Sequence, residues 1–193
     1  MGWRYATVCS SNMNRSMEAH FQLQKRGLSV RSFGTGSNVR LPGPSQDRPN
    51  VYEFGTPYSD IREDLTKKDE KLYTNNGLLG MLNRNVTVKL APERWHDMDK
   101  SNPFDVVLTY EERVFDAVIQ ELQSRATTTF YPVHVINIET RDNHEESVIS
   151  AQLTCSLCQD VEAAGDLQAQ LAGLIGAFHD KTQRAVLYSL VYV

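Results

Sequence analysis

CSSNMNRS, residues 9–16, follows a short apolar stretch, residues 5–8, and precedes a segment with helical periodicity, residues 16–26. Cys9 and Arg15 are separated by five residues, a spacing that lets the chain curl into a loop whose backbone N–H groups point inward. The helix that follows adds the positive end of its dipole. The sequence therefore predicts an anion-binding loop between a strand and a helix.

The same loop is expected to place a nucleophile beside the bound anion. Positive potential stabilises the thiolate of Cys9, which is the reactive form of a cysteine, and the hydroxyl of Ser16 can stabilise it further. The planar guanidinium of Arg15 can hold two oxygens of a phosphate. The remaining loop residues expected to contact phosphate are Ser10, Ser11, Asn12, Met13 and Asn14. The residues alone also allow a buried structural cysteine beside a helix-capping run of Ser and Asn.

Composition narrows the class of protein. The chain has 193 residues, of which 40% are hydrophobic and 23% charged, an ordinary balance for one globular domain. A formal net charge of -4 argues against a general nucleic-acid binder, which needs clustered Lys and Arg. We find no apolar run typical of a signal peptide or a membrane span, so we expect an intracellular protein without direct nucleic-acid or membrane binding.

Three cysteines without a secretory signal indicate a reducing compartment, in which Cys9 stays reduced. Cys155 and Cys158 form a single C-x-x-C, which is compatible with a redox pair or half a zinc site. A second pair of ligands with metal spacing is absent from the sequence. We therefore interpret the pair as two small apolar residues on a buried helical face, and we expect no metal and no cofactor.

Predicted strands alternate with predicted helices along the chain. The strands comprise residues 5–8, 28–33, 104–109, 133–138 and 184–193. The helices comprise residues 16–26, 58–72, 78–82, 111–125, 144–163 and 166–181. This order indicates an α/β fold with a doubly wound, mostly parallel five-stranded sheet and helices on both faces. Because two helices precede the last strand, we expect that strand to be antiparallel and at an edge.

Residues 37–100 are expected to form an insertion, within a single domain of residues 1–193, that packs over the mouth of the core. Three prolines and a glycine in residues 37–50 indicate a loop, and residues 51–54 are expected to pair briefly as a strand. The charged run of residues 67–71 is interpreted as a solvated helical face.

In doubly wound sheets, ligands bind at the carboxyl ends of the strands. Cys9, the glycine-containing residues 34–36, and Asp142 each follow a predicted strand, so we expect them to meet at one edge. The glycines would allow the backbone to approach the anion-binding loop closely.

Hydrolysis of a phosphate monoester also requires an acid that protonates the leaving oxygen. Asp142 is the candidate, and Glu139, Glu145 and Glu146 are its rivals, although the last two are expected in the first turn of a helix. Asp142 can alternatively cap that helix. The five histidines lack a motif and are interpreted as structural or surface groups.

Several motifs along nearly the whole chain resemble one family. They are CSSNMNRSMEAH, RSFGTG, RLPGP, NVYEFGT, KLYTNNGLL, PERW, EERVFDAV, PVHVINIE and DNHEE. The chain resembles the RNA polymerase II carboxyl-terminal-domain (CTD) phosphatases that are related to low-molecular-weight tyrosine phosphatases. The resemblance implies a nuclear, metal-independent phosphoserine phosphatase that acts on the fifth and seventh positions of the polymerase heptad. It also implies binding to the symplekin scaffold of the cleavage and polyadenylation machinery.

By position, this resemblance makes Cys9 the nucleophile, Arg15 the phosphate clamp and Asp142 the general acid. The family accepts the serine–proline bond in its cis form, which folds back tightly and needs a roofed groove. The resemblance makes the inserted region, residues 37–100, the source of that groove. Its expected walls are Arg40, Leu41, Pro42, Tyr73, Leu78 and Met81.

Two departures from the family pattern leave a divergent paralogue open. Glu139 stands where Asp is usual, and residues 86–90 are less basic than expected. The alternatives are a low-molecular-weight tyrosine phosphatase, although the chain has no Asp-Pro dipeptide, and an arsenate reductase that uses Cys155 and Cys158. A third is a catalytically weak module that binds the phosphorylated tail or the scaffold.

Overall fold

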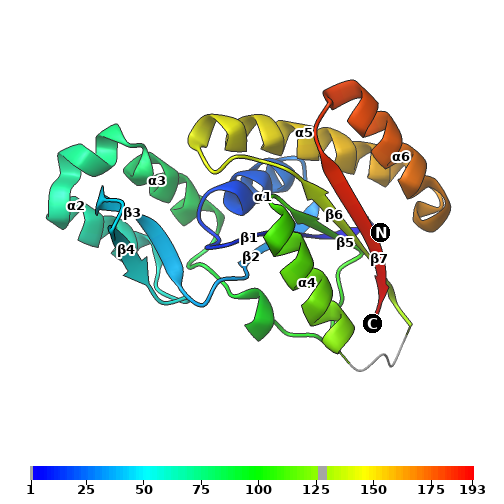
Figure 1. Cartoon of the computed structure of the whole chain (residues 1–193), viewed down its shortest axis with the longest axis horizontal. Coiled ribbons are helices and arrows are strands. Elements are labelled where there is room, and N and C mark those ends of the chain that lie inside the picture. Colours follow the sequence, from blue (N-terminus) through cyan, green and yellow to red (C-terminus); the bar gives the residue numbers. More distant parts are fainter. Residues whose placement is uncertain (1, 126–129) are drawn as a thin grey trace.

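The computed structural model describes residues 2–125 and 130–193 (Figure 1). Its strands are β1 (Arg4–Cys9), β2 (Ser29–Gly34), β3 (Val39–Ser45), β4 (Arg48–Tyr52), β5 (Val106–Thr109), β6 (Pro132–Ile138) and β7 (Val186–Tyr192). Its helices are α1 (Arg15–Lys25), α2 (Tyr58–Asn75), α3 (Leu78–Val88), α4 (Glu112–Ser124), α5 (His144–Ala163) and α6 (Leu167–Thr182), with a 3-10 turn, η1, at Trp95–Asp97.

Five strands form the main sheet in the order β2-β1-β5-β6-β7. The first four are parallel, and β7 pairs with β6 in the antiparallel sense at the edge. This sheet confirms the predicted α/β fold, including the reversed C-terminal strand. Because β1, β5 and β6 run the same way, the loops that follow them open at the same edge of the sheet.

Helices cover both faces of the sheet, and each face has its own apolar cluster. Along β5, Val106 and Leu108 pack in the cluster beneath α1, α5 and α6, whereas Val107 packs in the cluster beneath α4 and η1. Alternation of this kind is the period of two that a strand imposes. Both faces of the central strands are buried, which explains the near-continuous apolar sequence there.

A two-stranded antiparallel hairpin, β3–β4, corrects the prediction of a loop over residues 37–50 and of a strand over residues 51–54. The register shifts between Leu41 and Ser45, so the hairpin is irregular where Gly and Pro occur. A ribbon of two strands has an open edge on each side, where a proline without an N–H interrupts no ladder.

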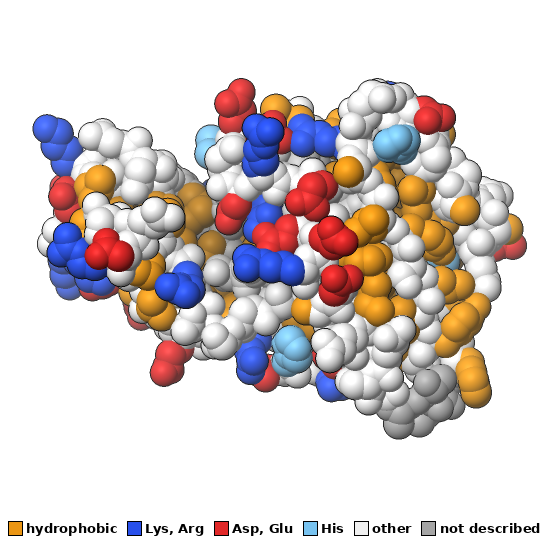
Figure 2. All heavy atoms as spheres, viewed as in Figure 1, with side chains coloured by type: hydrophobic (Ala, Val, Ile, Leu, Met, Phe, Trp, Pro, Cys, Tyr) orange, Lys and Arg blue, Asp and Glu red, His pale blue; other side chains and the backbone are white. Residues whose placement is uncertain are grey.

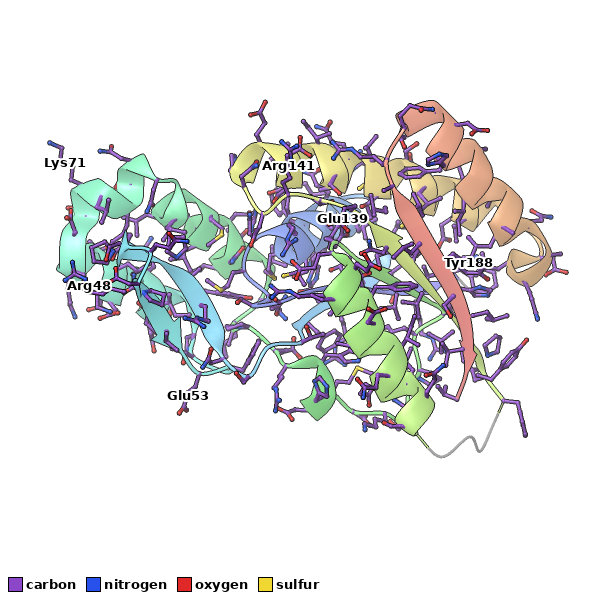
Figure 3. All side chains as sticks on the ribbon, in the orientation of Figure 1. Arg48, Glu53, Lys71, Glu139, Arg141 and Tyr188 are labelled. Atoms are coloured by element: carbon purple, nitrogen blue, oxygen red, sulfur yellow. The ribbon has the colours of Figure 1, made fainter. Side chains whose placement is uncertain are left out.

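Helices α2 and α3 extend away from the main sheet beside this hairpin (Figure 1). The predicted helix over residues 58–72 is interrupted at Asp69, which has φ -167° and ψ 86°. The Asp69 carboxylate accepts a hydrogen bond from Leu72 N at 2.9 Å and so restarts the helix. Residues 67–71 are exposed, as predicted, and Lys71 projects from the outer end of this region (Figure 3).

Surface charge on the face shown in Figure 2 is mixed, with acidic and basic side chains adjacent over the middle of the molecule. This face therefore lacks the continuous basic patch of a general nucleic-acid binder. In the described part of the chain, none of the helices is long and apolar enough to cross a membrane.

Cys155 and Cys158 confirm the prediction of a buried helical face, since both thiols lie on α5 within the core beneath α1. Burial raises the pKa of each thiol. Among residues 2–125 and 130–193, no cluster of three metal-ligating side chains occurs.

Candidate active site

The loop between β1 and α1 is held first by the end of β2. The carbonyl of Cys9 accepts a hydrogen bond from Thr35 N (3.0 Å), and that of Ser10 accepts one from Gly36 N (2.9 Å). A Cβ atom on Gly34 would lie 2.7 Å from Ser10 O, and one on Gly36 would lie 3.0 Å from it. The close approach predicted for these glycines is confirmed, because a side chain at either position would push the loop away.

The other side of the loop is held by helices α2 and α3. Tyr58 donates its hydroxyl to Asn12 O at 2.7 Å. Arg84 Nη2 and Asn85 Nδ2 both donate to Met13 O at 2.9 Å. The loop carbonyls are therefore turned outward by groups that come from distant parts of the sequence.

Backbone N–H groups of residues 10–14 donate to no acceptor in the part of the protein that the structure describes. Asn12 has φ +53°, the left-handed conformation that Asn tolerates better than most residues. Because the carbonyls are held outward, the amides are available to an anion at the N-terminus of α1.

Cys9 lies at the end of β1, where Ser16 contacts its sulfur. The distance from Cys9 Sγ to Ser16 Oγ is 3.0 Å, and Asn12 Nδ2 donates to the same Oγ at 3.1 Å. Asn12 Oδ1 accepts from Glu93 N, which fixes the orientation of the amide. Since Asn12 already donates to Ser16, the hydroxyl hydrogen of Ser16 is free to point at the sulfur.

Arg15 is buried, with only 5% of its side chain exposed, and is anchored from three directions. Its Nη1 donates to Tyr110 O (3.3 Å) and Thr140 O (3.0 Å), and its Nη2 donates to Glu111 Oε2 (2.6 Å). The Nε has no hydrogen-bond partner and lies 3.5 Å from Asp142 Oδ1. A buried N–H without an acceptor is unfavourable, so Arg15 presents a donor that a phosphate oxygen would satisfy.

The negative charges around Arg15 offset the cost of burying its guanidinium. Burial opposes the guanidinium charge, but Cys9, Asp142 and Glu111 outweigh it and raise the pKa of Arg15 above its ordinary value. Burial likewise opposes the charge on Glu111, yet hydrogen bonds from Arg15 and Arg113 lower the pKa of its carboxyl. Glu111 therefore stays ionised as the anchor of Arg15. The sequence reasoning missed this residue, although its position directly after a buried strand was a signal.

Asp142 lies in the loop between β6 and α5, with 60% of its side chain exposed. Asn14 Nδ2 donates to its Oδ1 at 2.9 Å. The capping role that the sequence left open belongs to the next residue, because the side chain of Asn143 accepts from Glu146 N at 2.9 Å. Glu139, the rival of Asp142, follows the end of β6 and accepts from Asn137 Nδ2 (Figure 3). It does not line the cavity described below.

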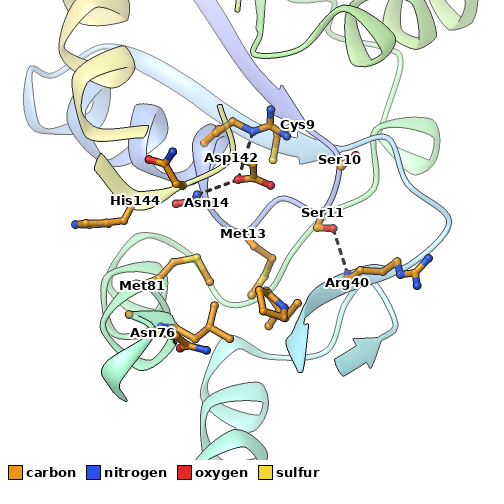
Figure 4. Close-up of a pocket in the computed structure, with 16 residues that line it drawn as sticks. Cys9, Ser10, Ser11, Met13, Asn14, Arg40, Asn76, Met81, Asp142 and His144 are labelled. Carbon is orange, nitrogen blue, oxygen red and sulfur yellow. Dashed lines mark hydrogen bonds and ion pairs between the residues drawn. The ribbon is translucent and has the colours of Figure 1, made fainter. Parts of the chain in front are cut away.

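These groups border a cavity of about 280 Å³ (Figure 4). Its lining includes Cys9, Ser10, Ser11, Met13, Asn14, Arg15 and Asp142, together with Arg40, Leu41, Pro42, Leu78 and Met81 from the inserted region. The thiol, the guanidinium and the apolar side chains thus border the same cavity. Four further lining residues, Asn76, Gly77, Asn143 and His144, were not predicted from the sequence. His144 is an exposed surface group, as predicted, and it also borders the cavity.

Tyr73 differs from the prediction, because it does not line this cavity. It is 2% exposed in the core of the inserted region, where its hydroxyl accepts from Asn50 Nδ2 at 2.9 Å. The interruption of α2 at Asp69 turns the last part of that helix, which the sequence pattern did not indicate. Tyr73 therefore packs in the apolar cluster beneath the lining residues Leu41, Leu78 and Met81.

A thiol, a loop of free amides and a buried guanidinium at the carboxyl ends of parallel strands are typical of one class of protein, the phosphate-monoester hydrolases that use a cysteine nucleophile. Within that class, the match to one family is specific. Residues 3–193 match the family described as Ssu72-like protein. The chain belongs to this family.

Relatives cover almost the whole chain. The RNA polymerase II C-terminal domain phosphatase SSU72 of Mus musculus is 50% identical over 189 residues, which are 98% of this chain and 96% of the relative. SSU72 like protein 5 of Homo sapiens is 46% identical over the same shares. A solved structure of Drosophila melanogaster Ssu72 with Symplekin, bound to a cis peptidomimetic of a CTD phosphoserine peptide, has a TM-score of 0.94. It is 43% identical and covers 100% of this chain and 99% of its own.

Proposed function

We propose that this protein is a cysteine-dependent phosphatase that removes phosphate from phosphoserine–proline sites of the RNA polymerase II CTD. The observation that carries the proposal is the buried Arg15, whose Nε lacks a hydrogen-bond partner at a cavity that also contains Cys9. A phosphate bound there would supply the missing acceptor. The choice of substrate follows from the relatives, which are named as CTD phosphatases.

The reaction has two steps. In the first, Cys9 Sγ attacks phosphorus in line with the seryl oxygen, the P–O bond breaks, and Asp142 gives its proton to the departing oxygen. In the second, Asp142 takes a proton from water, and the water oxygen displaces the sulfur to release inorganic phosphate. Arg15 and the amides of residues 10–14 stabilise the charge on the phosphoryl oxygens throughout.

The inserted region, residues 37–100, acts in this proposal as a cap that provides the groove for the peptide. Leu41, Pro42, Leu78 and Met81 supply apolar lining of the cavity, and Met81 lies across it from Cys9 (Figure 4). A cis prolyl bond turns the peptide back on itself, so a narrow cavity with one apolar wall suits it. The relatives also support a nuclear location and binding to a scaffold of the symplekin type.

An arsenate reductase is less compatible with the site, because a resolving thiol must reach the nucleophile. Cys155 and Cys158 are buried on α5 and do not line the cavity. A module that binds without turnover would leave the same groove and loop in place. Only a measurement of catalytic activity distinguishes such a module from a phosphatase.

Release of phosphate from a phosphorylated heptad peptide tests the proposal. Cys9→Ser should lower kcat by at least about a thousandfold, since the nucleophile and its partners act as a unit. The unfolding midpoint should stay close to that of the unchanged protein. Full activity in this variant would disprove the thiol mechanism, whereas no activity in the unchanged protein, with the peptide still bound, would favour the binding module.

A further inference from the structure

We propose that Asn14 is a positioning residue that holds Asp142 by one carboxylate oxygen, so that the other oxygen carries the proton to the leaving group. The inference rests on the proposed function, because it assumes that Asp142 is the acid. It assigns to a residue of the phosphate loop a role that is separate from binding phosphate.

Asn14 occupies the N-cap position of α1 but does not cap the helix. Asn at this position ordinarily accepts a hydrogen bond from a backbone N–H of the first turn, which stabilises the helix. Asn143 and Asp166 do so at the starts of α5 and α6. Asn14 makes no side-chain capping bond, and its Nδ2 points instead to Asp142 Oδ1 at 2.9 Å (Figure 4). The side-chain amide of Asn14 therefore bonds to the Asp142 carboxylate instead of capping α1.

Both donors near Asp142 converge on the same oxygen. Asn14 Nδ2 and Arg15 Nε lie 2.9 Å and 3.5 Å from Oδ1, whereas Oδ2 contacts no donor in the described residues. A carboxylic acid carries its proton on the oxygen that accepts fewer hydrogen bonds. The geometry therefore assigns the transferable proton to Oδ2.

Bound phosphate makes Asn14 the more important of the two donors. Arg15 Nε is the unpaired donor that a phosphate oxygen would take, and its N–H would then be engaged by the substrate and not by Asp142. Packing does not restrain Asp142, since 60% of its side chain is exposed and it lies in a loop. The hydrogen bond from Asn14 is thus the contact that keeps the acid over the loop during the reaction.

Asn14→Ser separates this role from a structural one. Ser is as good an N-cap as Asn, so the variant keeps or improves the start of α1. Its side chain is too short to span the 2.9 Å hydrogen bond that Asn14 makes to Asp142. A purely structural role therefore predicts normal activity for Asn14→Ser, and the positioning role predicts a loss.

The experiment compares Asn14→Ser, Asp142→Asn, the double variant, and Asn102→Ser as a control at an exposed site. Each acts on a phosphoserine–proline peptide and on p-nitrophenyl phosphate, whose leaving group needs little protonation. The rate compared is that of phosphocysteine formation in the first turnover, because the later hydrolysis of this intermediate uses Asp142 with both substrates. We expect Asn14→Ser to lower this rate on the peptide roughly ten- to a hundredfold. The effect on the aryl phosphate should be about threefold or less, by the same reasoning, and inhibition by inorganic phosphate should not change. The double variant should be no slower than Asp142→Asn, because both changes remove one function.

The outcomes are distinct. If Asp142→Asn slows phosphocysteine formation from both substrates equally, Asp142 is not the acid, and the inference fails with that part of the proposed function. If Asp142→Asn slows the peptide selectively but Asn14→Ser does not, the proposed function stands and the inference is wrong. Equal slowing of both substrates by Asn14→Ser, or additive effects in the double variant, would show that Asn14 acts on the loop instead.

Discussion

The phosphate loop (residues 9–16) and the β3–β4 hairpin lie on opposite sides of one cavity and are held in place differently. In the loop, hydrogen bonds from three separate elements fix the carbonyls, and Cys9 and Arg15 are each 4% exposed. In the hairpin, Arg40 and Pro42 are exposed, and Arg40 N contacts the loop only through Ser11 Oγ, at 3.2 Å. The chemical side of the cavity is therefore fixed by hydrogen bonds from distant residues, while the recognition side is held mainly by the apolar packing of Val39 and Leu41 with residues of α2 and α3.

Arg84 on α3 links the inserted region to the phosphate loop and to α1, and its removal should have the largest effect. Its Nη1 pairs with Glu18 at 2.5 Å, and 10% of the Arg84 side chain and 5% of the Glu18 side chain are exposed. Burial lowers the pKa of Arg84, because the interior disfavours the charged guanidinium, and Glu18 opposes this effect. Arg84→Met should leave Glu18 buried and unpaired and reduce the free energy of unfolding by about 3–5 kcal/mol, as measured in urea.

Two further variants sharpen this test. Arg62→Met changes an exposed arginine on α2 that bonds to Asn83, and it should cost less than about 0.5 kcal/mol. Adding Glu18→Gln to Arg84→Met should recover part of the loss, because the unpaired buried charge disappears. If Arg84→Met is no worse than Arg62→Met, the link between loop and inserted region is not carried by this pair.

Gly43→Ala should separate recognition from chemistry with a smaller effect. A Cβ atom at this position would lie 1.7 Å from the carbonyl oxygen of Arg48 across the hairpin, so β3 and β4 must move apart. We expect kcat/KM for the phosphopeptide to fall about tenfold, equivalent to about 1.4 kcal/mol, with little change for p-nitrophenyl phosphate. Gly80→Ala is the matched control, since no atom lies within 4 Å of its Cβ. Equal losses on both substrates would show that the hairpin also supports the loop.

The same contrast explains what the sequence could predict. The strand, loop, nucleophile and guanidinium lie within twelve residues, so the chemistry of residues 5–16 could be interpreted from local sequence. The mostly parallel sheet and the reversed β7 at its edge could be predicted from the alternation of elements, but the strand order could not. In the inserted region, Pro and Gly indicated a loop, whereas a two-stranded ribbon tolerates them at its open edges.

Long-range geometry accounts for the other differences. Glu111 anchors Arg15 only because β5 lies beside β1, and a single sequence does not contain that pairing. Long-range geometry also explains why His144 lines the cavity and Tyr73 does not. The turn of α2 at Asp69 buries Tyr73, and the start of α5 brings His144 to the cavity.

Tyr58→Phe is the mildest change that tests the comparison. Tyr58 is fully buried on α2, and its hydroxyl donates to Asn12 O at 2.7 Å; burial raises the pKa of this hydroxyl, so it remains a donor. Removal of the hydroxyl leaves the Asn12 carbonyl without that bond and should cost about 1 kcal/mol of unfolding free energy. Because this carbonyl helps to keep the loop amides inward, affinity for vanadate should fall severalfold.

Tyr52→Phe is the control for this last prediction, because the Tyr52 hydroxyl donates to Asp64 at 2.6 Å within the inserted region. It should cost no more than about 1 kcal/mol and leave vanadate affinity unchanged. If Tyr52→Phe weakens vanadate binding as much as Tyr58→Phe, the loop depends on the stability of the whole inserted region and not on one hydrogen bond. A difference between the two would locate the coupling in the single hydrogen bond from Tyr58 to Asn12.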